Sequence, residues 1–171
     1  MTDVGELAVL IDDKNRIIGY RDKIEAHRWP TPLHRAISVV LFDKDKVLLQ
    51  KRSANKPIWP LYWSNTVCAN VTKAETYEEC AKRRLQEEMG IKTNIKEVFK
   101  FKYRRRYNKI YGEHELDTVF IGEYSGSVIP DPDEAADYKW MGKRDLVRDI
   151  RKNPQKYTPW FKIILKKLEI L

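Results

Sequence analysis

The 171-residue chain lacks several features that would place it outside the cytoplasm. No apolar run approaches the roughly 20 residues that a helix needs to cross a bilayer. The N-terminus also lacks the basic start and apolar centre of a secretory signal peptide. We therefore expect a cytoplasmic protein that does not use a membrane as partner.

Cysteine is equally scarce, since only Cys68 and Cys80 are present. Two thiols in a chain without an export signal give little support for a disulfide, and Cys80 is typical of a small buried apolar residue. The chain also has no linker rich in Pro, Gly or Ser, no internal repeat and no low-complexity tract. These absences predict a single domain over residues 1–171.

Acidic residues are fewer than basic ones, 25 against 33, which gives a formal charge of +8 and a pI near 9.4. With 42% apolar and 34% charged residues, the composition is that of an ordinary globular protein. The charge favours an anionic partner, and at this level nucleic acid and a diphosphate are both open.

The strand signals are short β-prone segments separated by turn residues. We predict strands over 6–11, 16–20, 36–43, 47–52, 63–68, 99–107, 114–124 and 137–141, with a single helical turn at 23–27. Segment 99–107 alternates between an apolar face and a basic face. The basic face, Lys100 to Arg106, is more typical of a solvated strand face than of a site.

Three segments carry helix signals. Thr76 and Glu79 form a capping-box pattern before a helix that ends at Gly90, in which apolar residues recur every four positions: Tyr77, Ala81, Leu85 and Met89. We predict further helices over 142–152 and 160–171, the last with Thr158 as N-cap and Pro159 at its first position. Many strands with segregated helices indicate an α+β fold.

Residues 69–91 resemble the Nudix box, a glycine and a glutamate followed by a helix with a fixed pattern of arginine and glutamates. The matching positions are Glu75, Arg83, Leu85, Glu87, Glu88, Gly90 and Ile91. Ala69 stands where the box has glycine, and Arg84 stands where it has a Mg²⁺-binding glutamate. Phosphate hydrolysis needs several hard oxygen ligands around Mg²⁺, so the loss of one counts against a hydrolase. The resemblance implies a mixed β-sheet core sandwiched by helices.

One branch of that superfamily, the type 1 isopentenyl-diphosphate isomerases, typically has arginine at the position of Arg84. The rest of the chain resembles this branch from about residue 6 to 165. The matching positions are His27, His34, Cys68 in NTVC, Tyr103, Glu113 and Glu115 in GEHE, and Trp160 in TPW.

The resemblance implies specific roles. Cys68 and Glu115 would face each other across the substrate as acid and base, with Tyr103 assisting the carboxylate. Trp160 would offer an aromatic face to a carbocation-like state. The cations implied for the diphosphate are Lys23, Arg52, Lys56 and Arg84. For Cys68, a buried apolar role is the simpler alternative.

The resemblance also implies two metal sites. One would hold Zn²⁺ or Mn²⁺ on His27, His34, Glu113 and Glu115, with Asn70 where the family has a third histidine. Glu113 and Glu115 are two residues apart on a strand, so both side chains point to one face. The amide oxygen of Asn70 is neutral and is a harder ligand than imidazole. It should therefore lower the affinity of the site for a metal ion or move its preference toward Mg²⁺ or Mn²⁺. The other site would use Glu88 for Mg²⁺. Because Arg84 and Glu88 are four apart on one helix face, a surface ion pair is the alternative.

The function implied by this resemblance is metal-dependent interconversion of isopentenyl and dimethylallyl diphosphate by protonation and deprotonation. The partner would be a small diphosphate and not nucleic acid, and the protein a monomer or weak dimer. Two other classes stay open: a Nudix hydrolase of a nucleoside or prenyl diphosphate, and a basic protein that binds RNA on a degenerate Nudix scaffold.

Overall fold

The computed structural model describes residues 6–171, which form a mixed nine-stranded sheet and four α-helices. The strands are β1 (Leu7–Ile11), β2 (Ile17–Asp22), β3 (His34–Asp43), β4 (Lys46–Arg52), β5 (Trp63–Ser64), β6 (Val67–Asn70), β7 (Ile95–Arg106), β8 (Gly112–Glu123) and β9 (Ala135–Gly142). The helices are α1 (Lys23–Ala26), α2 (Tyr77–Met89), α3 (Lys143–Lys152) and α4 (Pro159–Lys167), with a 3₁₀ turn, η1 (Pro154–Lys156). The predicted α+β class is confirmed.

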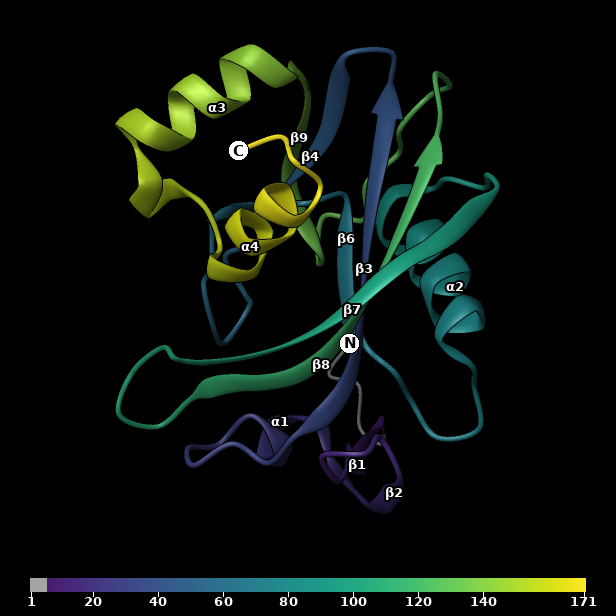
Figure 1. The fold of residues 1–171 in the computed structure, drawn as a ribbon, viewed down its shortest axis with the longest axis vertical. Helices are drawn as coiled ribbons and strands as arrows, with labels where there is room; N and C mark the ends of the chain where they lie inside the picture. Colours follow the sequence, from purple (N-terminus) through teal and green to yellow (C-terminus); the bar gives the residue numbers. More distant parts are fainter. Residues whose placement is uncertain (1–5) are drawn as a thin grey trace.

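Strand β3 is the centre of the sheet (Figure 1). It runs parallel to β8 and antiparallel to β1, β4 and β6. β7 and β8 form a long hairpin, and β9 pairs with β4. The parallel pairing of β3 and β8 joins segments that are far apart in the chain, and it positions the candidate site.

Helices cover both faces of the sheet (Figure 1). On one face, Leu85 and Met89 of α2 pack against Ile37 of β3. On the other face, α3 and α4 lie over a second cluster that includes Val40 of β3 and Phe161 of α4. Since successive side chains of a strand point to opposite faces, the even-numbered residues of β3 face α4. Every helix in residues 6–171 is too short or too polar to span a lipid bilayer.

Helix α2 begins and ends as its sequence predicts. The Thr76 hydroxyl accepts a hydrogen bond from the Glu79 backbone nitrogen at 3.2 Å, and the Glu79 carboxylate accepts one from the Thr76 nitrogen at 2.7 Å. Gly90 closes the helix with φ at +66°, where a Cβ would lie 2.9 Å from the carbonyl oxygen of Ile129. Only glycine meets both demands without strain.

The predicted single strand over 63–68 is wrong, because two residues that are not in a strand separate β5 from β6. The Asn65 amide donates to the Val67 carbonyl at 2.6 Å. The Thr66 hydroxyl accepts from the Leu41 nitrogen at 2.9 Å. These side chains bond backbone groups that a continuous strand would have used for pairing. Pairing with β3 begins again at β6, which extends to Asn70.

The closing helix also differs from the prediction over 160–171. α4 starts at Pro159, the predicted first position, but it ends at Lys167 with Leu168 as its C-cap, four residues before the predicted end. Thr158 stands at the N-cap position without a capping side-chain hydrogen bond. Its hydroxyl bonds instead with that of Ser64 at 2.9 Å, so a contact with β5 replaces the expected cap.

Candidate active site and metal centre

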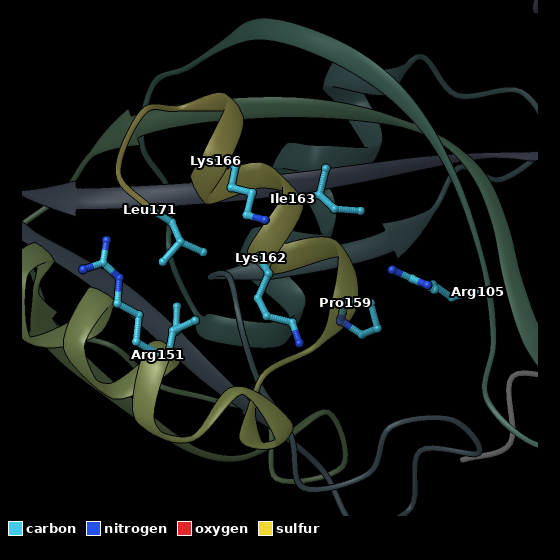
Figure 2. Close-up of a pocket in the computed structure, with 8 residues that line it drawn as sticks. Arg105, Arg151, Pro159, Lys162, Ile163, Lys166 and Leu171 are labelled. Carbon is cyan, nitrogen blue, oxygen red and sulfur yellow. The ribbon is translucent and has the colours of Figure 1, made fainter.

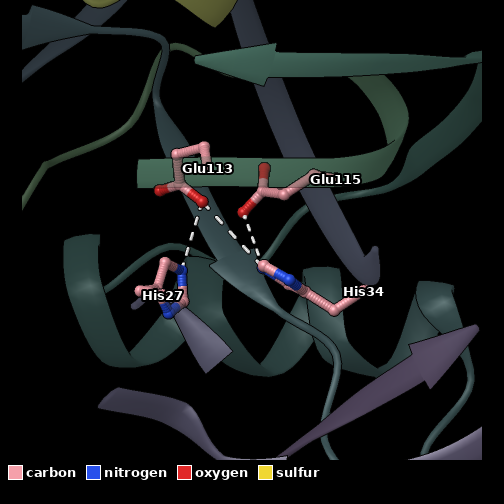
Figure 3. A group of neighbouring side chains, drawn as sticks. All are labelled: His27, His34, Glu113 and Glu115. Carbon is pink, nitrogen blue, oxygen red and sulfur yellow. Dashed lines mark ion pairs between the residues drawn. The ribbon is translucent and has the colours of Figure 1, made fainter. Parts of the chain in front are cut away.

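Four buried side chains converge at one end of β3 and β8 (Figure 3). They are His27, His34, Glu113 and Glu115, and one ligand atom from each lies within 4.8 Å of the others. This group, the His/Glu cluster, contains the two histidines and two carboxylates that the sequence analysis proposed as ligands.

The strand register explains the convergence. His34 of β3 lies opposite Glu115 of β8, and Glu113, two residues earlier on β8, points to the same face. His27 follows α1, and its carbonyl accepts a hydrogen bond from the Gly112 nitrogen at 2.9 Å. That bond ties the end of α1 to the start of β8, so His27 reaches Glu113.

Backbone carbonyls fix both imidazoles. Nδ1 of His27 lies 2.6 Å from the carbonyl oxygen of Lys23, and Nδ1 of His34 lies 2.9 Å from that of Pro32. A carbonyl only accepts, so each Nδ1 donates, and Nε2 of each ring is the nitrogen that faces the carboxylates. Histidine ligands of metals are commonly oriented in this way.

The facing atoms suit a cation between them. Nε2 of His27 lies 3.2 Å from Glu113 Oε2, and Nε2 of His34 lies 3.5 Å from Glu115 Oε1. His34 Nε2 and Glu113 Oε2 are buried without a hydrogen-bond partner among the described residues. Burial lowers the pKa of His27, which favours the neutral ligand form. The residues present therefore fit a divalent metal ion.

The two glutamates have opposite pKa shifts. Burial and the adjacent charge of Glu115 raise the pKa of Glu113 well above its usual value. Burial also acts to raise the pKa of Glu115, but its interactions with His34 and the hydrogen bond from Tyr103 outweigh it, so the pKa of Glu115 is lowered. Such opposed shifts within one buried group are typical of functional sites.

Tyr103 holds the second oxygen of Glu115. Its hydroxyl donates to Oε2 at 2.6 Å, across the β7–β8 register in which the two residues are opposite. Burial and the charge of Glu115 raise the pKa of Tyr103 well above its usual value, so the phenol keeps its proton. The two oxygens of Glu115 thus face different partners, His34 and Tyr103.

Asn70 lies beside the cluster at the end of β6. Its amide nitrogen donates to Glu115 Oε1 at 3.2 Å. Asn70 is therefore near the other proposed ligands, with its nitrogen rather than its oxygen directed at a carboxylate.

Cys68, Arg52 and Trp160 form the adjoining part of the site, on the face that α4 covers. Arg52 Nη1 lies 3.6 Å from Cys68 Sγ, and its guanidinium lies 5.3 Å from the Trp160 ring centroid. The Trp160 ring lies 6.2 Å from that of Tyr103. Burial raises the pKa of Cys68 to about 12, although the charge of Arg52 opposes it. The thiol is therefore held in its protonated form.

Glu88 and Arg84 belong to a different group. Arg84 pairs with Glu88 at 2.7 Å and with Glu134 at 3.0 Å, and Lys56 pairs with the same Glu134. Gln50 donates to Glu88 at 2.9 Å. The Arg84–Glu88 pair is buried, so the alternative of a surface pair is wrong, and Glu88 lies outside the His/Glu cluster.

Lys23 contacts the His/Glu cluster through its carbonyl, which bonds His27, while its ammonium pairs with Glu6 at 3.3 Å. The structure also adds residues that the sequence analysis missed. Glu134 follows a turn-rich segment without a recognisable pattern. Asp117 continues the two-residue period of β8, is buried, and accepts a hydrogen bond from Ser38 at 2.7 Å, so the alternation could have identified it.

Known proteins resemble this chain in sequence and in fold. The model of the NUDIX domain family matches residues 32–161. "Isopentenyl-diphosphate Delta-isomerase 2" of Aromatoleum aromaticum is 38% identical over 94% of this chain and 85% of its own length. "Isopentenyl-diphosphate Delta-isomerase" of Nocardia farcinica is 40% identical over 92% and 91%. The crystal structure of DR0079 from Deinococcus radiodurans superposes with a TM-score of 0.70 at 18% identity, over 86% of this chain and 90% of that one.

Proposed function

The chain belongs to the isopentenyl-diphosphate Delta-isomerase family of NUDIX-domain proteins, and from this membership we propose that it interconverts isopentenyl diphosphate and dimethylallyl diphosphate. One observation carries the proposal from the structural side. Glu115 accepts a hydrogen bond from Tyr103 and lies beside His34, while Cys68 lies on the same covered face of the sheet. This arrangement supports the pairing of an acid/base carboxylate with a thiol on one face of the sheet.

The reaction moves a double bond by adding a proton at one end of a three-carbon unit and removing one at the other. Alkenes are weak bases, so the proton donor has to be held against the reacting carbon. In one direction Cys68 gives its proton while Glu115 takes one, and in the reverse direction their roles exchange. Tyr103 positions the Glu115 carboxylate and stabilises its ionised form through the bond to Oε2.

Trp160 faces the positive charge that develops between these two groups. It is only 2% exposed and packs at a right angle to Trp59, with ring centroids 5.4 Å apart. An aromatic face stabilises a cation most strongly when water is excluded. Helix α4, which carries Trp160, therefore contributes both the ring and the cover over the site.

For the metal ion at the His/Glu cluster we propose Zn²⁺ or Mn²⁺, held by His27, His34, Glu113 and Glu115 Oε1, with Asn70 adjoining. Mixed imidazole and carboxylate ligands suit these ions. A bound ion would supply positive charge that keeps Glu115 ionised and fixed while Oε2 stays with Tyr103. Asn70 contributes no charge, so we expect weaker binding than a third imidazole would give.

We propose that the diphosphate binds at the Arg84 group, with Mg²⁺ on Glu88. Lys56 and Arg84 both pair with Glu134, so the substrate has to compete with that carboxylate for its cations. Before the substrate binds, the ion pairs with Glu134 hold the side chains of Lys56 and Arg84 in position. Arg52, whose Nη1 lies 3.6 Å from Cys68 Sγ, would orient the substrate chain toward the thiol.

Proton NMR of the purified protein with isopentenyl diphosphate in D₂O, with Mg²⁺ and in turn Zn²⁺ or Mn²⁺, tests the proposal. Deuterated dimethylallyl diphosphate is the expected product. Cys68→Ala should abolish its formation and leave folding intact, whereas Cys80→Ala removes the second cysteine, which is buried in α2, and should retain turnover.

Two results would overturn the assignment. Unchanged turnover in Cys68→Ala would remove the thiol from the mechanism. Release of phosphate without deuterium incorporation would identify a hydrolase, for which the intact Glu75–Arg83 pair of the box, at 2.9 Å, is the supporting observation.

A further inference from the structure

A hollow of about 590 Å³ lies between the last turn of α3, one face of α4 and β7 (Figure 2). It shares no lining residue with the His/Glu cluster or the Arg84 group. Its volume is within the range of cavities that hold small molecules, about 300–1,000 Å³. We call it the α3–α4 pocket.

Four cations surround the pocket: Arg105, Arg151, Lys162 and Lys166. Figure 2 shows Arg105 and Arg151 on opposite sides of Lys162. No acidic side chain lines the pocket, and within residues 6–171 none of the four cations forms an ion pair. Burial and the charges of Arg105 and Lys166 lower the pKa of Lys162. An anion would relieve this repulsion.

The rest of the wall is apolar. It consists of the side chains of Ile150, Pro159, Ile163 and Leu171, and the α-carboxylate of Leu171 forms no ion pair with the four cations. No aromatic ring lines the pocket, so it offers nothing for a nucleobase to stack on, which argues against a nucleotide or single-stranded RNA as occupant. The cations and the apolar wall together suit a molecule with an anionic head and an apolar tail.

We propose that the α3–α4 pocket binds an organic phosphate or diphosphate that carries an apolar chain. The phosphate would lie among Lys162, Lys166 and Arg105, and the chain against Ile163 and Leu171. Such a ligand has two sources, a free phosphorylated amphiphile or the headgroup of an anionic phospholipid. The site is separate from the proposed active site, so its test does not depend on isomerase activity.

Calorimetric titration with octyl phosphate in EDTA provides the test. EDTA removes divalent ions, which weakens binding at the metal-dependent diphosphate site and leaves the pocket unchanged. We expect saturable binding that the Lys162→Ala/Lys166→Ala variant weakens at least tenfold. The Lys152→Ala/Lys167→Ala control removes the same charge from exposed positions on α3 and α4 that do not line the pocket, and it should bind like the parent protein.

Ile163→Asn tests the apolar wall without changing the charge of the pocket, and it should also weaken octyl phosphate at least tenfold. Equal affinity for inorganic phosphate and octyl phosphate would overturn the proposed ligand class. The absence of saturable binding, or equal losses in the pocket and control variants, would overturn the site. Flotation with phosphatidylglycerol vesicles, compared with phosphatidylcholine, separates the sources: capture that the pocket variant abolishes indicates a lipid headgroup, and its absence with retained octyl phosphate binding indicates a free amphiphile.

Discussion

Removing the Tyr103 hydroxyl tests whether Glu115 depends on it. Tyr103→Phe keeps the ring, which packs against Phe101 and Trp160, and deletes only the 2.6 Å bond to Glu115 Oε2. A hydrogen bond to a charged group contributes about 1.5–3 kcal/mol. If that stabilisation acts in the transition state, kcat falls about 10- to 150-fold, at about 1.4 kcal/mol for each factor of ten.

The same loss changes the pH profile in a defined direction. The hydroxyl stabilises the ionised form of Glu115, so its removal raises the pKa of that carboxyl. The acidic limb of the kcat profile should therefore move to higher pH. The rate of deuterium incorporation, measured by NMR across pH at saturating metal, reports both kcat and the pH of the acidic limb.

Tyr157→Phe is the matched control. Tyr157 is buried, and its hydroxyl also donates to a carboxylate, that of Asp149, away from the His/Glu cluster. It should reduce stability modestly and leave kcat and the acidic limb unchanged. If Tyr103→Phe behaved in the same way, the assistance that we assign to Tyr103 would be refuted.

Three further predictions concern metal affinity and stability. Asn70→His should tighten Zn²⁺ binding by about 10- to 100-fold in calorimetry, because it adds an imidazole beside Glu115; unchanged affinity would place Asn70 outside the coordination sphere. Thr76→Ala should lower the free energy of unfolding in urea by about 1 kcal/mol through loss of the α2 cap, and an unchanged midpoint would contradict it. Burial alone would raise the pKa of Glu75, but hydrogen bonds from Arg83 and Thr72 lower it to about 2. The ionised Glu75 carboxylate therefore stabilises the folded state fully above pH 4.5, and this stabilisation is lost as the pH falls toward 2. The difference in Tm between the parent protein and Glu75→Gln should shrink over that interval, and a constant difference would show that the charge is not responsible.

The sequence predicted best the elements that neighbouring residues determine. The capping box of Thr76 and Glu79 and the stop at Gly90 act within one turn of chain, and the structure confirms both. The alternation of β7 likewise depends on side chains two residues apart, and its basic residues are exposed as expected. Local patterning cannot detect the break at Asn65 and Thr66, because their partners include backbone groups of β3 and β4.

The site required information that periodicity does not contain. Spacing alone placed Glu113 and Glu115 on one face, but only the resemblance to a known family linked them to His27 and His34. The structure brings those four together through the parallel pairing of β3 and β8. Glu134 lay beyond both kinds of reasoning, because its contacts with Arg84 and Lys56 arise from the chain that connects β8 to β9.

The parallel pairing of β3 and β8 also orders events during synthesis of the protein. His34 leaves the ribosome roughly eighty residues before Glu115, a delay of about 4–16 s at common elongation rates of about 5–20 residues per second. Neither histidine can meet its carboxylate partners until β8 has emerged and paired with β3. Metal acquisition is therefore a late step, and a chain stalled before β8 would expose a central strand without its parallel neighbour.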